Sequence, residues 1–347
     1  MTPSDSSQHE ENVHISTFRV PETFDDERLD RVLPGNYSGY TRGFFQRLIR
    51  ENQVLLNETP CKTAQRVTAG DCITVQWPPE DGVHMQAESI PLNVLYEDAD
   101  ILVINKPSGL IVHPARENET GTLAHALLAY DEEVFRELVD ETRRPGIVHR
   151  LDRDTTGTMV IAKHETARRQ LKTAFAERRV EKTYLLLVQG EFGAKTATIR
   201  KPIQRHPTQR RKMTVANDGK PATTHYRVLS THHNASLVEA CIETGRTHQL
   251  RVHFAHIYHP VLGDDVYGGK QRDLPVQPPR QMLHAWKLAF PHPATGQTKE
   301  FMADIPNDFQ QTAELLGFPA LNRSAPEIDA PESPFPPSTP QTNRDNA

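Results

Sequence analysis

The stretch Gly146–Lys163, GIVHRLDRDTTGTMVIAK, presents the carboxylate of Asp152 among basic side chains and between two apolar runs. Its core is HRLD (149–152), preceded by two apolar residues and followed by a threonine-rich turn and the apolar run 159–162. The pattern predicts two short buried strands that flank a loop carrying Asp152. Neighbouring positive charge favours an ionised carboxylate, which is the form that acts as a nucleophile or a base. The four letters HRLD alone are more typical of an aspartate that caps a turn beside surface arginines.

The composition predicts a soluble chain with room for two folded domains. The chain has 347 residues, 36% of them hydrophobic, with a mean hydropathy of −0.61. No stretch approaches the roughly 18 apolar residues of a membrane span, and no apolar signal core stands near the start. The cysteines Cys61, Cys72 and Cys241 are scattered and form no CxxC pair, which argues against a zinc finger or a disulfide framework. We therefore expect a cytoplasmic protein without a membrane segment.

The net charge of −5 hides a basic central region. Residues 1–32 hold eight acidic and three basic side chains, and residues 303–347 hold seven and two. Residues 33–302 therefore keep 35 of the 40 basic and 30 of the 45 acidic side chains, a surplus of five positive charges. A mildly basic body is compatible with nucleic-acid binding, for which local clusters matter more than the total charge.

Composition and apolar pattern divide the chain into two modules, a linker and two tails. We expect a polar, disordered tail over residues 1–17, a small module over 18–77 and a polar linker over 78–91. A larger domain is expected over 92–319, followed by a second disordered tail, rich in proline and serine, over 320–347.

The small module should contain an amphipathic helix followed by short strands. Between a candidate N-cap at Thr41 and a left-handed residue at Asn52, four apolar side chains pair at helical spacing within 42–50. Arg42 and Arg47 lie off that apolar face. By composition alone this helix reads as an ordinary solvated amphipathic helix. Short strands are expected after it, at 54–56 and 73–75.

The larger domain reads as strands with interspersed helices, which predicts an α+β fold with a mixed, mainly antiparallel sheet. Helical spacing of apolar residues predicts helices around 123–128, 167–175 and 250–257. The segment 200–212, RKPIQRHPTQRRK, holds six bases and no acid, and we expect it to form an exposed loop. Apolar runs predict strands at 101–104, 182–189, 223–229, 236–243 and 283–290.

The whole run from Gly146 to Gly157 closely resembles the central motif of the RluA-type pseudouridine synthases. In that family the aspartate of this motif is the catalytic residue, so the resemblance implies that role for Asp152. Thr158 departs from the small or aliphatic residue that is usual there, and it lies beyond the turn. The resemblance extends over about residues 18–302 and implies the pseudouridine synthase fold for the larger domain.

Two further motifs carry the same resemblance. In GRTHQLRVH (245–253), the arginine that corresponds to Arg251 pairs with the catalytic aspartate in the family. The pattern K-x-Y at 182–184 matches the family's active-site tyrosine, which implies that Tyr184 stacks on the target uracil and is a candidate for removing its C5 proton. Gly263-Asp264 and Leu283–Ala285 also resemble family stretches, without an implied chemical role. Taken singly, a helix-surface arginine or a strand tyrosine is most often structural.

The N-terminal pattern ERLDRVL…TRGFFQRLIRENQVLLN…VTAGDCITV, within residues 27–75, resembles an S4 RNA-binding module. Asn52 stands where that family usually has glycine, and an asparagine is compatible with the same backbone. RHPTQRRKM (205–213) and GKPATTHY (219–226) resemble the subfamily that joins an S4 module to this catalytic domain and modifies large-subunit ribosomal RNA. The fold implied for the whole chain is an α+β catalytic domain preceded by a small S4-like α/β module.

Residues and resemblance together imply an enzyme that isomerises specific uridines to pseudouridine in structured RNA, with the target base flipped out of its stack. Asp152 starts the chemistry, either by adding to C1′ of the ribose or by removing the 2′ proton, and both routes stay open. The alternatives are the same chemistry on transfer RNA and a non-catalytic RNA-binding assembly factor. The candidate catalytic residues are Asp152, Tyr184 and Arg251, and the candidate substrate-binding residues are His149, Arg150, Arg246, His248, Arg42, Arg47 and Arg205.

We expect no cofactor and no metal, because the bond broken and the bond made lie within one nucleotide. His253, His256 and His259 recur every three residues and fan around a helix, unlike the i,i+4 pairs of helical zinc sites. The motifs GxxxxGK[ST], GxGxxG and GxSxG are absent from the sequence, so nucleotide cofactors and serine hydrolysis have no support. The expected partner is structured RNA, bound by a monomer.

Overall fold

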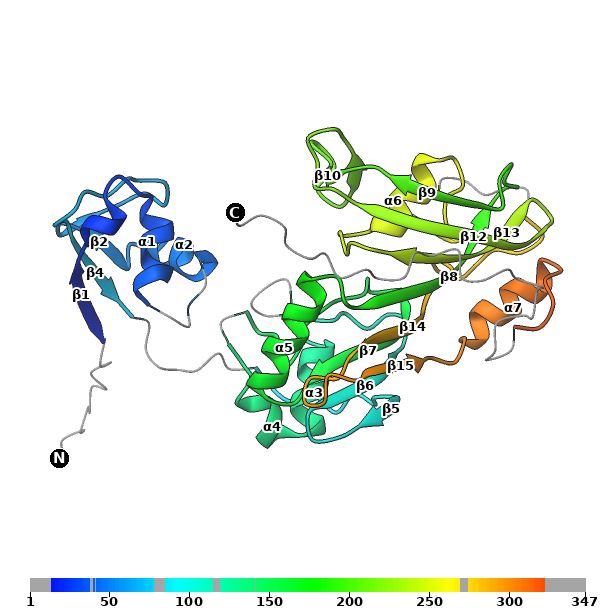
Figure 1. Ribbon diagram of the computed structural model, residues 1–347, viewed down its shortest axis with the longest axis horizontal. Helices are drawn as coiled ribbons and strands as arrows, with labels where there is room; N and C mark the ends of the chain where they lie inside the picture. Colours follow the sequence, from blue (N-terminus) through cyan, green and yellow to red (C-terminus); the bar gives the residue numbers. More distant parts are fainter. Residues whose placement is uncertain are drawn as a thin grey trace, which may run out of the picture. The chain divides into compact units, whose positions relative to one another are not determined.

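The chain folds into two compact units in the computed structural model, and each is described by itself (Figure 1). The first comprises Met1–Met85 with Asp140–Arg143, and the second comprises Gln86–Val139 and Arg144–Ala347. No helix of the described part of the chain is long and apolar enough to cross a membrane. The structure describes residues 14–37, 40, 42–77, 85–114, 119–140, 142–268 and 274–321.

The first unit is an antiparallel sheet with two helices packed on it. Its sheet has the strand order β1-β4-β2-β3. The helices contribute Leu33, Phe45 and Leu48 to a core that the strands complete with Val54 and Ile73. The elements are β1 (Ile15–Arg19), a short 3-10 helix (Glu22–Phe24), α1 (Leu29–Asn36), α2 (Arg42–Arg50), β2 (Val54–Leu56), β3 (Thr59–Pro60) and β4 (Cys72–Gln76).

The amphipathic pattern of this unit predicted its central elements correctly. The predicted helix is α2, which buries Phe45 and Leu48, and Asn52 adopts the left-handed conformation expected after it, with φ 58°. The predicted N-cap, Thr41, lies outside the described residues. The tail predicted over 1–17 was wrong at its end, because β1 begins at Ile15 and pairs with β4.

The second unit is built on one large sheet with the order β5-β6-β7-β14-β8-β13-β12-β9, and β15 pairs with β14. Among the described strands of this sheet, β7 and β14 are parallel and the other neighbours are antiparallel, which confirms the predicted α+β class. The strands are β5 (Val94–Glu97), β6 (Ile101–Lys106), β7 (Thr156–Ala162), β8 (Glu181–Gln189), β9 (Thr196–Arg200), β12 (Thr223–His232), β13 (Ala235–Ile242), β14 (Leu283–Pro291) and β15 (Thr298–Met302).

Helices cover this sheet and fix the ends of its central strands. α5 packs on β7 and β14 through Ala167 and Leu171, as its i,i+4 spacing predicted (Figure 1). α7 buries Phe309 against Leu185 and Trp286. The helices are α3 (Leu123–Tyr130), α4 (Glu132–Arg136), α5 (Glu165–Ala176), α6 (Gln249–His256) and α7 (Asn307–Leu315).

The strand predicted after the central loop is present, but the strand predicted before it is not. β7 follows the loop as predicted, and all seven of its residues are buried. Before the loop there is a single bridge, between Ile147 and Ile161, instead of a strand. Gly146 has φ 66° and would hold a Cβ only 2.1 Å from the carbonyl oxygen of Ala162. The chain therefore crosses β7 at close range and turns away, so pairing ends after one residue.

Three other elements also departed from expectation. The basic segment 200–212 was predicted to be a loop, but β10 (Ile203–Arg205) lies within it and pairs with β11 (Met213–Val215). β15 and α7 were missed, because β15 is a largely polar, half-exposed edge strand and α7 has a short apolar stripe. In each case tertiary pairing outweighed a weak local signal.

Candidate active site

A cavity of about 490 Å³ opens in the second unit beside the central loop. Its walls are residues 148–152 of that loop, the C-terminal end of α5, the side chains of Lys182 and Tyr184 on β8, and residues 242–251. The sheet supplies the rigid floor, because β8 pairs with both β13 and β14. Polar side chains from segments far apart in sequence thus meet around a single hollow, as is typical of a ligand site.

Arg251 pairs with Asp152 in the wall of this cavity. The Nη1 of Arg251 donates a hydrogen bond of 3.0 Å to Oδ2 of Asp152. The side chain of Arg251 is 6% exposed and that of Asp152 is 18% exposed, so the pair is shielded from bulk water. Charge-assisted hydrogen bonds are strengthened under such shielding. The other carboxylate oxygen of Asp152, Oδ1, lies 3.9 Å from Nε2 of His248.

Asp264 holds the same guanidinium from the opposite side. Its carboxylate accepts hydrogen bonds from Nε and Nη2 of Arg251, at 2.6 and 2.9 Å, and its side chain is fully buried. Backbone N–H groups of Val266 and Tyr267 also donate to Asp264. Burial lowers the pKa of Arg251, but the hydrogen bonds and charges of Asp264 and Asp152 raise it above its usual value. The guanidinium therefore stays charged and fixed in orientation.

Sequence reasoning noticed Asp264 but gave it no chemical role. The turn that carries it depends on Gly263, which has φ 72° and would hold a Cβ only 1.9 Å from the carbonyl oxygen of Arg280. A glycine-aspartate pair is a signal of such a turn. The sequence does not show that Asp264 contacts Arg251, because the two residues come together only when the chain turns back after the end of α6.

Tyr184 reaches the cavity from the middle of the sheet. The residue is 9% exposed and its ring lies in the wall that also holds Asp152. Burial raises the pKa of the Tyr184 hydroxyl, and the charge of Asp152 raises it further. At neutral pH the phenol therefore keeps its proton, so before substrate binds it is a stacking surface and a hydrogen-bond donor.

His149 anchors the central loop to the sheet. Its Nε2 accepts the backbone N–H of Val160 at 3.0 Å, and its ring stacks on Phe175 with centroids 4.8 Å apart. Burial, and secondarily the charge of Lys182, lowers the pKa of His149 to about 3. The ring is therefore neutral at physiological pH, and it brings no positive charge to a substrate.

Three more predicted residues line the cavity. Arg150 is exposed at its edge. Arg246 also lies in the wall, where its Nε donates to the carbonyl of Pro221 at 3.1 Å. His248 begins α6 in the left-handed conformation, and its Nδ1 shares a hydrogen bond of 2.8 Å with the hydroxyl of Tyr267. Burial lowers the pKa of His248 despite the neighbouring Asp152.

The remaining predicted residues lie elsewhere. Arg205 is exposed on β10, where its Nη1 donates to the carbonyl of Arg210 at 2.6 Å, and it is not part of the cavity wall. Arg42 and Arg47 belong to the first unit. The Nη2 of Arg42 lies 2.9 Å from the fully buried carboxylate of Asp30. Arg47 lies over the Phe44 ring at 5.5 Å.

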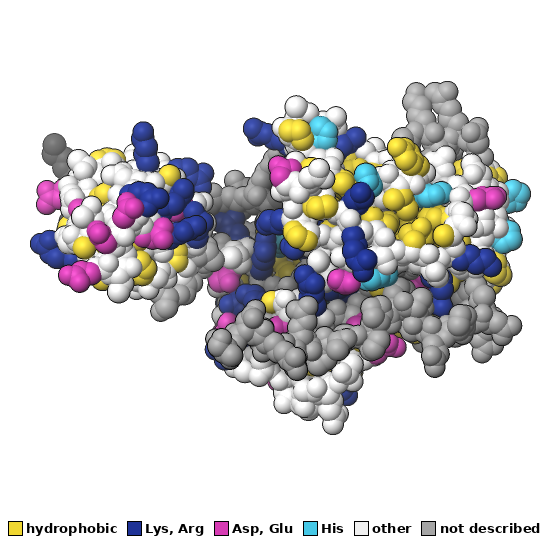
Figure 2. All heavy atoms as spheres, turned by 45° about the horizontal axis from the view of Figure 1, so that its top comes forward, with side chains coloured by type: hydrophobic (Ala, Val, Ile, Leu, Met, Phe, Trp, Pro, Cys, Tyr) yellow, Lys and Arg dark blue, Asp and Glu magenta, His cyan; other side chains and the backbone are white. Residues whose placement is uncertain are grey.

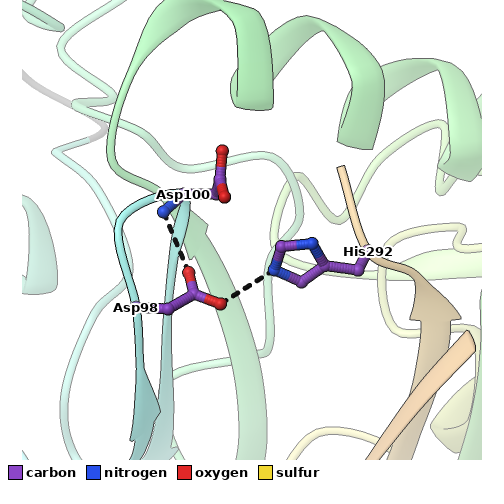
Figure 3. A group of neighbouring side chains, drawn as sticks. All are labelled: Asp98, Asp100 and His292. Atoms are coloured by element: carbon purple, nitrogen blue, oxygen red, sulfur yellow. Dashed lines mark hydrogen bonds and ion pairs between the residues drawn. The ribbon is translucent and has the colours of Figure 1, made fainter. Parts of the chain in front are cut away.

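One cluster in the described chain has the composition of a metal site, formed by Asp98, Asp100 and His292 (Figure 3). Its hydrogen bonds give the histidine another role. The Nδ1 of His292 accepts the N–H of Ala294, so Nε2 carries the proton that it donates to Asp98 at 2.8 Å. Metal binding requires a bare ring nitrogen, and here that nitrogen is used as a donor.

Two of the three regularly spaced histidines likewise make hydrogen bonds within the fold, and His259 lies beyond the end of α6. His253 bonds to Oγ1 of Thr224 through Nδ1 and to the carbonyl of Lys201 through Nε2, both at 2.9 Å. The Nδ1 of His259 bonds to the carbonyl of Gln189 at 2.8 Å. A carbonyl can only accept, so each ring nitrogen that faces one carries a proton. These two protonated ring nitrogens are therefore unable to bind a metal ion as they stand.

Comparison with known proteins assigns the chain to a family. Residues 100–256 match the model of the RNA pseudouridylate synthase family. The chain is 40% identical over 300 residues to an uncharacterised RNA pseudouridine synthase of Aquifex aeolicus, covering 84% of this chain and 94% of that protein. It is 40% identical over 306 residues to the ribosomal large subunit pseudouridine synthase D of Haemophilus influenzae, covering 84% and 91%.

The solved structures agree at the level of the fold. Human RNA pseudouridylate synthase domain containing 1 is similar with a TM-score of 0.52 and 28% identity, over 66% of this chain and 90% of that one. The similarity to bacterial relatives spans nearly their whole length, including the ribosomal large subunit pseudouridine synthase D of Escherichia coli K12, at 38% identity over 94% of that protein. The chain therefore belongs to the RluA-type RNA pseudouridine synthases, isomerases that convert uridine to pseudouridine in RNA.

Proposed function

We propose that this protein isomerises specific uridines of large-subunit ribosomal RNA, with Asp152 as the catalytic residue. The observation that carries the proposal is the 3.0 Å hydrogen bond from Arg251 to Asp152 in the wall of a cavity that Tyr184 also lines. The ribosomal substrate is supported by relatives named ribosomal large subunit pseudouridine synthase D, which match about 84% of this chain at 40% identity or slightly less.

The target uridine has to leave its stack, because its glycosidic bond is inaccessible in a paired helix. In the proposed complex the flipped base enters the cavity and stacks against Tyr184. Arg150 and Arg246, which line the cavity, are proposed to contact the backbone of the RNA. Figure 2 shows Lys and Arg side chains on the visible face of this unit, which supports an electrostatic contribution to binding.

Asp152 then breaks the bond between C1′ of the ribose and N1 of the uracil. One route has a carboxylate oxygen attack C1′, so that the bonding electron pair leaves with the uracil. The other has the carboxylate remove the 2′ proton, which gives a glycal and the same detached base. Among the described residues no hydrogen bond reaches Oδ1 of Asp152, so this oxygen is available for either step.

The reaction closes within the same nucleotide. After the uracil has turned, C5 bonds to C1′, which in the first route breaks the bond between C1′ and Asp152 and frees the carboxylate; the C5 proton then passes to a base, and N1 gains a proton. In the glycal route C2′ also regains the proton it gave up. No atom is gained or lost, so the chemistry requires no cofactor. Arg251, fixed by Asp264, holds Asp152 in position while the substrate displaces water from the cavity.

The first unit is proposed to be an S4-like RNA grip. We propose 18–77 as this module, extended at its start to include β1 from Ile15, with 78–91 as the linker and 92–319 as the catalytic domain. Arg47 is half-buried on α2 over the Phe44 ring, and Arg42 is 46% exposed at its side chain although it pairs with Asp30. Arg205, on the exposed hairpin of β10 and β11, is proposed as a further phosphate contact. The protein would act as a monomer in the cytoplasm, on ribosomal RNA or pre-ribosomal particles.

The test is to map pseudouridines by chemical adduct formation and primer extension in RNA from cells that lack this chain. We expect specific stops in large-subunit ribosomal RNA to disappear, to return with the wild-type chain, and to stay absent with Asp152→Asn. Loss of sites in transfer RNA alone would replace the ribosomal assignment. Unchanged modification everywhere, with RNA binding retained, would favour a non-catalytic assembly factor.

A further inference from the structure

Lys182 is a buried cation in the wall of the active-site cavity. It lies on β8, two residues before Tyr184, and both side chains line the same hollow. Residues two apart on a strand project to the same face, about 6–7 Å from each other. Lys182 is only 8% exposed, whereas lysine side chains are almost never buried without a partner.

The ammonium group of Lys182 has no polar partner in the described part of the chain. It lies over the ring of Phe175, whose centroid is 5.8 Å from Nζ. Lys106 shows the usual alternative, because its buried ammonium donates to the carbonyls of Pro107, Leu110 and Arg153, each at 2.8 Å. The Nζ of Lys182 is not among the fully enclosed atoms without a hydrogen-bond partner, so it opens to the cavity although the residue as a whole is buried. The N–H groups of Lys182 are therefore left for an acceptor that enters the cavity.

Other charged and titratable groups surround Lys182 from each packed element. Arg178 follows α5, Cys241 lies on β13, and His149 belongs to the central loop. Burial, and then the charge of Arg178, lowers the pKa of Lys182 to about 8. The group is therefore mostly protonated at neutral pH and loses its charge just above it.

We propose that Lys182 donates a hydrogen bond to a carbonyl oxygen of the flipped uracil and stabilises the negative charge that this base acquires. The inference rests on the function proposed above. When the bond between C1′ and N1 breaks, its electron pair stays on the uracil and is shared among N1, O2 and O4. A fixed cation at O2 or O4 stabilises that charge as it forms. Lys182 keeps its proton throughout.

The depth of Lys182 favours the base over the phosphate backbone. Arg150 and Arg178 are exposed at the edge of the same cavity, where a backbone phosphate can approach them in water. Lys182 is far less exposed than they are, at 8%, and it lines the cavity together with Tyr184, which is proposed to stack on the uracil. The part of the substrate that reaches this depth is the flipped base, whose acceptors are its carbonyl oxygens.

The experiment compares Lys182→Met, Lys182→Arg and wild type in single-turnover isomerisation at saturating RNA, with RNA affinity measured separately. Methionine keeps an unbranched apolar stem and removes the charge. We expect Lys182→Met to lower the saturated rate about 100-fold while the Kd for RNA changes less than about threefold. Lys182→Arg should recover part of the rate. The matched control is Lys287→Met, a strand lysine over the Trp286 ring that is not in the cavity wall, and we expect it to match wild type.

The pH dependence of the saturated rate distinguishes a catalytic role of Lys182 from a purely structural role, which would leave that dependence unchanged. The saturated rate of wild type should fall as pH rises through about 8, because Lys182 loses its charge there. Lys182→Arg should remove that fall up to about pH 10, since arginine stays protonated. The wild-type profile and Lys182→Arg keep the inference testable even if Lys182→Met melts early.

Two outcomes overturn the inference. One is a Lys182→Met rate within about threefold of wild type. The other is an unchanged saturated rate with a weaker Kd and a flatter salt dependence, which would place the ammonium on a phosphate. A failure of the proposed enzymatic function can be distinguished from a failure of the Lys182 role, because in the first case the wild-type protein itself converts no uridine. An active wild type, a dead Asp152→Asn and an active Lys182→Met would leave the function standing and remove only this role.

Discussion

The Nη1 of Arg251 lies 3.0 Å from Oδ2 of Asp152, although the two residues are 99 positions apart in the chain. The same guanidinium uses its Nε and Nη2 to hold the buried carboxylate of Asp264. One arginine thus divides its donors between a fully enclosed carboxylate and one that faces a cavity. The enclosed carboxylate fixes the arginine, and the arginine fixes the reactive group.

Replacing Asp152 by asparagine should abolish isomerisation and leave RNA affinity within a few-fold of wild type. The amide keeps the shape of the side chain, but it is a far poorer nucleophile or base, so we expect a loss of at least about a thousandfold. Pseudouridine formation on purified RNA and a binding titration measure the two effects. Turnover near the wild-type rate would remove Asp152 from the mechanism.

Replacing Asp264 by asparagine should reduce both stability and activity. Breaking a buried ion pair typically costs about 3–5 kcal/mol, and the side chain of Asp264 is fully enclosed. The remaining amide can accept one hydrogen bond from Arg251, so we expect a loss of about 3 kcal/mol. Urea unfolding measures the stability. If the variant unfolds like wild type, Asp264 does not hold the guanidinium as its geometry indicates.

Replacing Tyr184 by phenylalanine separates stacking from proton chemistry. The ring remains, so RNA affinity should change little, while loss of the hydroxyl should slow turnover about 10²-fold or more if it takes part in removing the C5 proton. The measurement is the rate of C5 proton release at saturating RNA. Full activity in the variant would limit the role of Tyr184 to stacking.

Replacing His149 by glutamine should flatten the acid side of the stability profile. The pKa of His149 is lowered to about 3 in the folded chain, below its usual value near 6.5. Between these values the unfolded chain binds more protons, so wild-type stability falls as pH drops from about 6.5 toward about 3. Melting temperatures from pH 7 to pH 4 test this. Parallel curves for the two proteins would show that His149 titrates normally.

Deleting residues 1–85 should leave a folded but weaker and less selective enzyme. The second unit has its own core, and the deletion removes Arg42 and Arg47. For each phosphate that the shortened protein no longer binds, the log–log salt dependence of RNA binding should flatten by about 0.7–0.9. An unchanged salt slope and unchanged site choice would mean that the first unit is not an RNA grip. A truncated chain that cannot fold would place the domain boundary elsewhere.

The local pattern of the chain was sufficient for its strongest elements. The i,i+4 stripe of Ala167 and Leu171 predicted α5, and continuous apolar runs predicted β8 and β14, because burial on one face or on both leaves a periodic record in the sequence. The candidate residues Asp152, Tyr184 and Arg251 came instead from the resemblance of their motifs to those of a known family, because each residue taken singly is most often structural.

Tertiary structure alone decided which polar groups meet. Arg42 was predicted to bind the substrate, but in the folded chain its guanidinium pairs with the buried carboxylate of Asp30. His149 was likewise predicted to contact the substrate, but its Nε2 accepts a hydrogen bond from the backbone of β7. Asp264 meets Arg251 of α6, and Lys182 lies over Phe175 of α5, so both contacts depend on how the helices pack. Periodicity reports whether a side chain is buried, whereas its partner is set by how separate elements pack, as for Arg251 and Asp152, 99 positions apart, and no local pattern encodes that pairing.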